Sequence, residues 1–125
     1  MNNKKCISFF KELASDQNLI DRALKYCNEN ISSSKSESEA IGEPPLNGFH
    51  PDEIICRFDR QSFVFSHDIL DHQFVETQIG LYIKDDDDVH FRGIIPIGTY
   101  RLITTLEGED EDDYFVLTEK RDDIK

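Results

Sequence analysis

Thr-Tyr-Arg-Leu-Ile-Thr-Thr-Leu (residues 99–106), Glu-Gly-Glu-Asp-Glu-Asp-Asp (107–113) and Tyr-Phe-Val-Leu-Thr-Glu (114–119) follow one another and decide the fold. The two outer blocks are rich in β-branched and aromatic residues, which suit a half-buried strand. The middle block holds one glycine and six carboxylates, so it cannot be a buried strand. This pattern predicts an antiparallel hairpin with an acidic tip.

The chain before this hairpin also reads as short strands joined by turns. Apolar alternation predicts strands at residues 53–58, 62–66, 73–84 and 89–95. Asp59-Arg60-Gln61 and Asp85–Asp88 read as turns, and Pro96-Ile97-Gly98 is expected to break the strand ladder. Together with the hairpin, these segments predict an antiparallel meander of about six strands.

The N-terminal third has a helical pattern instead. Residues 4–14 and 16–30 carry apolar side chains at helical spacing, and the second stripe comprises Ile20, Ala23, Leu24, Cys27 and Ile31. The polar, Ser-rich residues after this stripe indicate a flexible loop. We therefore expect one α+β domain over residues 1–125, with two N-terminal helices (1–31), a loop (32–50) and a sheet (51–125) on which the helices pack.

Charge is distributed unevenly along the 125 residues. The formal net charge is −12. Residues 1–50 hold 7 acidic and 6 basic residues, whereas residues 51–125 hold 19 acidic and 8 basic residues. Such a field repels nucleic acid and anionic membranes and attracts basic proteins. The alternative is that the acidic surface only aids solubility.

Cysteine use and hydropathy indicate the compartment. The three cysteines, Cys6, Cys27 and Cys56, include no close pair, which argues against a disulfide framework and fits a reducing environment. Cys27 and Cys56 are interpreted as packing residues. No apolar run reaches signal-peptide or membrane-span length. These features predict a soluble cytoplasmic protein.

The two densest acidic segments are the expected partner-binding surface. In a six-stranded meander, one turn near Pro96 separates them, so both are expected at the same end of the sheet. Tyr114 follows the second segment and offers an aromatic anchor for a partner. The predicted binding residues are Asp85, Asp86, Asp87, Asp88, Glu107, Glu109, Asp110, Glu111, Asp112, Asp113 and Tyr114.

The search for metal-binding and catalytic motifs does not favour an enzyme or a metalloprotein. Neither acidic segment has the ligand spacing of an EF-hand loop, because the sixth residue from Asp85 is His90 and from Asp110 is Phe115. Residues 66–72, Ser-His-Asp-Ile-Leu-Asp-His, either form a polar loop or, if helical, place Asp68 with His72 and His67 with Asp71 on shared faces, where a metal could bind. No nucleophile motif and no phosphate-binding loop occurs. We expect no enzyme activity, no cofactor and no metal.

The hairpin sequence also carries a resemblance. Tyr100-Arg-Leu-Ile-Thr-Thr-Leu-Glu-Gly-Glu, followed by Asp112-Asp-Tyr-Phe-Val-Leu, is similar in style to C-terminal hairpins of bacterial toxin-immunity proteins, including those of contact-dependent growth inhibition systems. The resemblance implies a non-enzymatic protein that binds one cognate toxin domain, often a nuclease, and blocks its active site or substrate surface. It assigns no role to any residue. The alternative is an acidic interaction or nucleic-acid-mimic module that regulates a nucleic-acid-handling protein.

Overall fold

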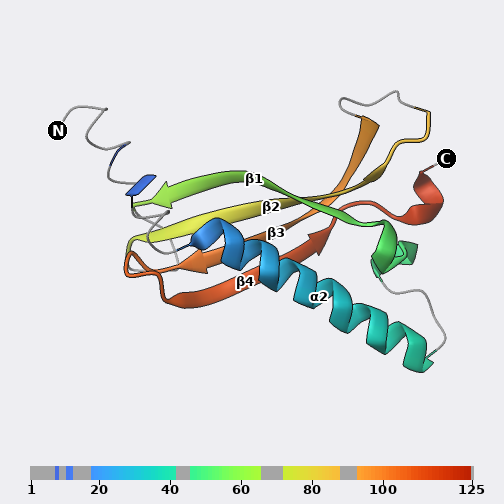
Figure 1. Cartoon of the computed structure of the whole chain (residues 1–125), viewed down its shortest axis with the longest axis horizontal. Helices are drawn as coiled ribbons and strands as arrows, with labels where there is room; N and C mark the ends of the chain where they lie inside the picture. Colours follow the sequence, from blue (N-terminus) through green and yellow to red (C-terminus); the bar gives the residue numbers. More distant parts are fainter. Residues whose placement is uncertain are drawn as a thin grey trace.

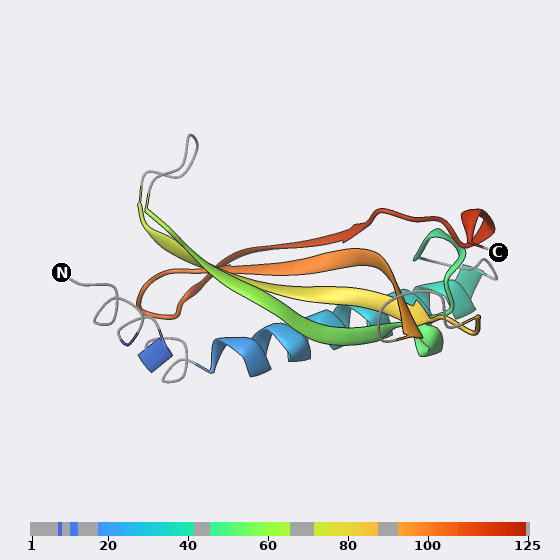
Figure 2. The same ribbon diagram turned by 90° about the horizontal axis from the view of Figure 1, so that it is seen from above.

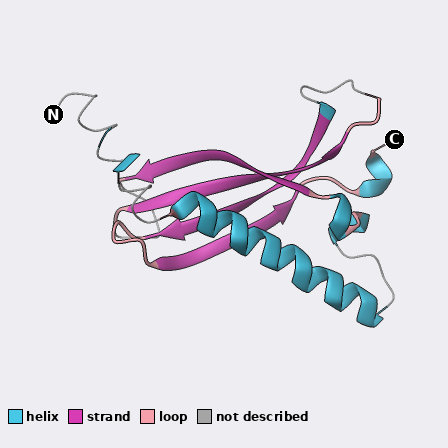
Figure 3. Ribbon diagram, viewed as in Figure 1, coloured by secondary structure: helices cyan, strands magenta, loops and turns pink. Residues whose placement is uncertain are grey.

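The fold is α+β, with one helix packed on a four-stranded antiparallel sheet (Figures 1 and 3). The computed structural model describes residues 8, 11–12, 18–41, 46–65, 72–87 and 93–124. The sheet is a meander in the order β1-β2-β3-β4. Its helix and strands are α2 (Leu19–Ile41), β1 (Ile55–Val64), β2 (Phe74–Lys84), β3 (Ile94–Thr104) and β4 (Asp110–Leu117). The α+β class is confirmed, whereas the described residues form four strands and not about six.

Helix α2 is longer than the sequence pattern predicted. It covers the predicted helix from Leu19 onward, but it continues through residues 32–41, which were expected to form a loop. Along this extension serine hydroxyls donate to carbonyls one turn earlier: Ser34 Oγ lies 3.0 Å from the Asn30 oxygen, and Ser36 Oγ lies 3.3 Å from the Ser32 oxygen. Most of the first predicted helix, residues 4–14, lies outside the described residues, although Ser8, Lys11 and Glu12 are helical.

Helix α2 lies along one face of the sheet, as Figure 2 shows, and its apolar stripe packs on that face. Ala23, Cys27 and Ile31 are buried as predicted, and Leu19 joins them. The sheet supplies alternate residues of β2 and β3 to the same core: Ile79, Leu81, Ile83, Ile97, Tyr100 and Leu102. Packing on this face fixes the position of α2 beside the C-terminal hairpin. Phe49, in the connection from α2 to β1, is also fully buried in this core.

Two predicted strands prove to be one. The expected turn at Asp59–Gln61 is wrong, because β1 runs without interruption from Ile55 to Val64. The register with β2 shifts between Phe58 and Arg60, so Asp59 is a β-bulge. A bulge and a tight turn favour similar polar residues. The sequence alone therefore did not separate them.

Strand β3 likewise continues through the expected break. Pro96 pairs with Tyr82 of β2, and the register shift beside it accommodates Ile97. On its other side, β3 pairs with β4 only from Gly98 onward. Pro96 therefore lies where β3 has no hydrogen-bonded strand on that side among the described residues, and there a missing N–H is tolerated.

The acidic hairpin forms, but its tip is shorter than predicted. A turn spans Thr105 to Glu109, with the Gly108 N–H donating to the Thr105 carbonyl at 3.0 Å. Gly108 adopts a φ of 85°, which favours glycine. Asp110–Asp113 belong to β4 and not to the turn. Consecutive turns of a meander lie at opposite ends, so the expected shared end for the two acidic segments is wrong (Figure 1).

Candidate partner-binding cleft

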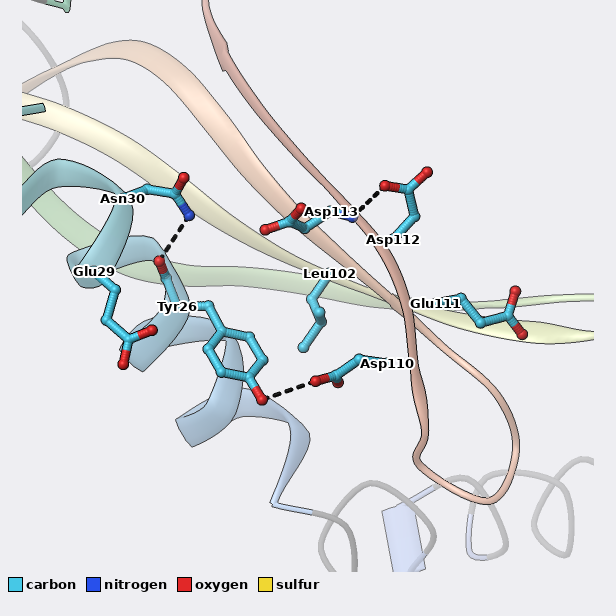
Figure 4. A pocket seen from close by; sticks show the side chains of 8 residues that line it. All are labelled: Tyr26, Glu29, Asn30, Leu102, Asp110, Glu111, Asp112 and Asp113. Carbon is cyan, nitrogen blue, oxygen red and sulfur yellow. Dashed lines mark hydrogen bonds between the residues drawn. The ribbon is translucent and has the colours of Figure 1, made fainter. Parts of the chain in front are cut away.

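An open cleft of about 500 Å³ lies between helix α2 and strand β4. Leu102 of β3, which is buried, contributes an apolar surface to it. Figure 4 shows the helix on one side and β4 on the other. The lining residues are Tyr26, Glu29, Asn30, Leu102, Asp110, Glu111, Asp112 and Asp113. Five of these eight side chains are carboxylates, so the cleft is strongly negative.

The helical wall follows from residue spacing. Tyr26, Glu29 and Asn30 are three and four residues apart, which places them on one face of α2. Asn30 Nδ2 donates to the Tyr26 carbonyl oxygen at 2.9 Å and is thereby oriented along the helix. The Tyr26 hydroxyl reaches across the cleft and donates to Asp110 Oδ2 at 2.8 Å (Figure 4).

A β-bulge gives the strand wall its unusual charge. Residues three apart on a regular strand face opposite sides of the sheet. The register with β3 shifts between Ile103 and Thr104, so that Asp110 pairs with Thr104 and Asp113 pairs with Leu102. Asp110 and Asp113 therefore both point toward the helix, as Figure 4 shows, while the two carboxylates between them point away at the rim.

Asp110 joins the hairpin to the helix. Its Oδ1 accepts a charge-assisted hydrogen bond from Arg22 Nη2, and its Oδ2 accepts from Tyr26. Arg22 Nη1 also donates to the Gly108 carbonyl at 2.8 Å. We refer to Arg22, Tyr26 and Asp110 as the clasp. Because its carboxylate is fully engaged, Asp110 contributes mainly to the placement of β4.

Asp113 is held by a buried tyrosine. The Tyr100 hydroxyl donates to Asp113 Oδ2 at 3.0 Å, and the tyrosine side chain is fully buried beneath the cleft. Burial, and secondarily this hydrogen bond, raise the pKa of Tyr100 well above its ordinary value. Tyr100 therefore belongs to the core and is not available to a partner.

The two rim carboxylates, Glu111 and Asp112, are held only by contacts at the surface. Asp112 accepts from the exposed Tyr114 hydroxyl at 2.9 Å, and this contact raises the pKa of Tyr114. Arg101 lies 5.2 Å from the centre of the Tyr114 ring. Glu111 Oε1 lies 2.5 Å from His72 Nε2. These contacts are at the surface, where water competes, so both carboxylates stay accessible to a partner.

Glu29 has no hydrogen bond or ion pair with any described residue. It is exposed on α2, opposite the acidic strand. Sequence reasoning missed it, together with Tyr26, Asn30 and Arg22. The helical spacing of Tyr26, Glu29 and Asn30 was readable, but nothing local indicated that this face borders β4. Their position depends on contacts between residues more than 80 positions apart.

The other predicted binding residues lie outside the cleft. Glu107 and Glu109 are exposed at the β3–β4 turn. Asp85 is buried, and its Oδ1 accepts from the Asp87 N–H in the β2–β3 turn. Asp86 and Asp87 are exposed at that opposite end of the sheet, and Asp88 lies outside the described residues.

The structure offers no metal centre within the described ranges: no group of three or more His, Cys, Asp or Glu side chains there is arranged to hold an ion. Of the 66–72 segment only His72 is described, and it contacts Glu111; residues 66–71 lie outside the described part. His50 caps the turn at Pro51–Glu53, its Nδ1 accepting from the Asp52 N–H at 3.1 Å.

Comparison with protein-family models, with curated proteins and with solved structures gave no match in any of the three. Within the described part of the chain, no helix has both the length and the hydrophobicity that a membrane span needs.

Proposed function

We propose that this protein is a non-enzymatic acidic binding protein that neutralises a basic partner through the α2–β4 cleft. Its most specific form is an immunity protein that inhibits a cognate nuclease toxin. The observation that carries the proposal is the cleft itself, because five of the eight residues that line it or form its rim are carboxylates.

The shape and chemistry of the cleft suit an arginine or lysine side chain. The aliphatic stem of such a residue can lie along the Tyr26 side chain of the helical wall, while its charged end lies among the carboxylates. A concave site with a low-dielectric wall concentrates the field of its charges. Basic residues that hold phosphates in a nuclease would be attracted by this field. Binding in the cleft would then cover them.

The carboxylates differ in how strongly the fold engages them, and this difference supports a binding role over a purely structural one. Asp110 and Asp113 are engaged by Arg22, Tyr26 and Tyr100. Glu29 has no partner among the described residues, and the rim residue Asp112 accepts hydrogen bonds only within its own strand, from the Asp113 N–H and the Tyr114 hydroxyl. A cluster that served only the fold would not require these additional like charges, which repel one another.

Affinity capture tests the proposal. The tagged full-length chain is incubated with lysate of the source organism at low salt and at ~0.5 M salt, where the Debye length falls to about 4 Å. One basic protein captured stoichiometrically at low salt supports the proposal. A partner encoded beside this gene favours immunity, whereas a nucleic-acid-handling protein of the host favours the regulatory alternative.

A matched pair of variants locates the surface. Glu29→Lys with Asp112→Lys reverses one charge on the helical wall of the cleft and one at its rim, and Asp86→Lys with Asp87→Lys reverses two exposed charges at the opposite end. Both variants change the net charge equally. Loss of capture in the first variant alone assigns binding to the cleft, and loss in the second alone contradicts that assignment.

A further inference from the structure

Two cysteines that are far apart in sequence meet between α2 and β1. Cys27 Sγ and Cys56 Sγ are 3.4 Å apart, although 29 positions separate the residues. Cys27 is fully buried on the helix, and Cys56 is half-buried on the edge strand. Both had been interpreted as packing residues. Both do pack in the core, and the fold also brings them together as a dithiol pair, with the more accessible sulfur at the sheet edge.

The two thiols share a hydrogen bond and therefore differ in acidity. The hydrogen bond to Cys27 lowers the pKa of Cys56 despite its partial burial. The same hydrogen bond, with burial, raises the pKa of Cys27. The thiolate is the reactive form of cysteine. Geometry and acidity thus agree that Cys56 is the sulfur that meets an oxidant first.

We propose that Cys27 and Cys56 form a redox modification site, in which a hydroperoxide converts the two thiols into an intramolecular disulfide. The Cys56 thiolate attacks the peroxide, the O–O bond breaks and the released alkoxide takes a proton to leave as an alcohol. Cys56 is then a sulfenic acid. Cys27 Sγ attacks that sulfur, the S–O bond breaks, and the departing hydroxide takes the Cys27 proton and leaves as water. The two thiols lose two electrons, which reduce one hydroperoxide.

The disulfide joins two elements that are already packed together. A sulfur–sulfur bond is about 2.05 Å long, so a small approach of the two side chains closes it. The disulfide would link α2 to β1, the two elements that residues 42–54 connect in sequence. Cys27 directly follows Tyr26, which lines the cleft. Oxidation therefore fixes the wall of the cleft against the sheet.

The test uses the full chain with Cys6→Ser, which leaves Cys27 and Cys56 as its only thiols. The folded protein is treated with hydrogen peroxide, quenched with a maleimide and examined by intact mass spectrometry. We expect a monomer lighter by two hydrogen atoms that takes up no maleimide, and that takes up two after reduction. In denaturant the same product should form at least about tenfold more slowly, because the fold no longer holds the thiols together.

Single variants test the order of the steps. With Cys27→Ser, Cys56 should accumulate as a sulfenic acid that dimedone traps. With Cys56→Ser, the buried Cys27 should stay reduced under the same exposure. Any one of three results would overturn the proposal: two free thiols after treatment, oxygen addition without disulfide formation, or disulfides only between molecules. The wild-type thiol pair carries the decisive measurement, so the proposal stays testable even if a variant fails to fold.

Discussion

The contacts of the clasp predict how much Asp110 contributes to the stability of the fold. Arg22 is 26% exposed and Asp110 is 43% exposed, so their charge-assisted contact is partly screened by water. Buried hydrogen bonds to charged groups contribute about 1.5–3 kcal/mol, and exposed ion pairs contribute about 0.2–1 kcal/mol. We expect a coupling free energy of about 1 kcal/mol between these two side chains.

A double-mutant cycle measures this coupling. Arg22→Met, Asp110→Ala and the double variant are unfolded in urea and followed by circular dichroism. Each single variant should lose about 1–2 kcal/mol of unfolding free energy, because Arg22 also loses its contact to the Gly108 carbonyl and Asp110 its contact to Tyr26. For a domain of this size, that is a fall in Tm of about 4–8 °C.

The control is Glu109→Ala, which removes an exposed neighbouring carboxylate that has no described partner. It should change stability by less than about 0.5 kcal/mol. Additive losses from Arg22→Met and Asp110→Ala would refute the clasp. Asp110 would then be a surface charge like Glu109, and its place in the fold would need another cause.

Three further changes have defined outcomes. Tyr100→Phe should lower the unfolding free energy by about 1–2 kcal/mol near pH 7. Because the folded state raises the pKa of Tyr100 above its ordinary 10.0, the unfolded chain loses this proton first. The unfolding free energy of the wild type should therefore fall as pH rises above about 10, and that of Tyr100→Phe should fall less steeply. Urea titrations of both proteins at pH 9 and 11 measure this, and an equal loss of unfolding free energy in the two proteins would contradict it. Gly98→Ala places a Cβ 2.3 Å from the Val116 carbonyl and should loosen the β3–β4 pairing, seen as faster amide hydrogen exchange in β4; unchanged exchange would contradict this. Phe49→Ala should cost about 3–5 kcal/mol in urea unfolding, because its side chain is fully buried, and a loss below about 1 kcal/mol would show that the connection from α2 to β1 is not anchored there.

The sequence predicted those features that depend on regular periodicity. The helical stripe of Ala23, Cys27 and Ile31 packs as expected, and the alternation of Ile79 and Leu81 correctly placed β2 and its buried face. In each case one face of the element is apolar over several turns or pleats. Burial then leaves the chain little choice of structure or orientation.

Features that depend on neighbouring strands were not predictable in the same way. Pro96 is compatible with β3 only because β4 has already ended, and Asp59 is a bulge only because β2 pairs on both sides of it. The cleft depends on contacts between residues that are even further apart in the sequence. Tyr26 and Asp110 meet although 84 positions separate them, and the bulge that turns Asp113 toward the helix leaves no local signature.

The central claim is that the α2–β4 cleft binds a basic partner. Its most direct test is a titration of the captured partner with wild type, the Glu29→Lys/Asp112→Lys variant and the Asp86→Lys/Asp87→Lys variant, at low salt and at ~0.5 M salt. We predict that the cleft variant weakens binding at least about tenfold at low salt, with a smaller effect at high salt, and that the opposite-end variant changes it by less than about threefold. Equal weakening by both variants would show that net charge alone governs binding, and would contradict the cleft as the site.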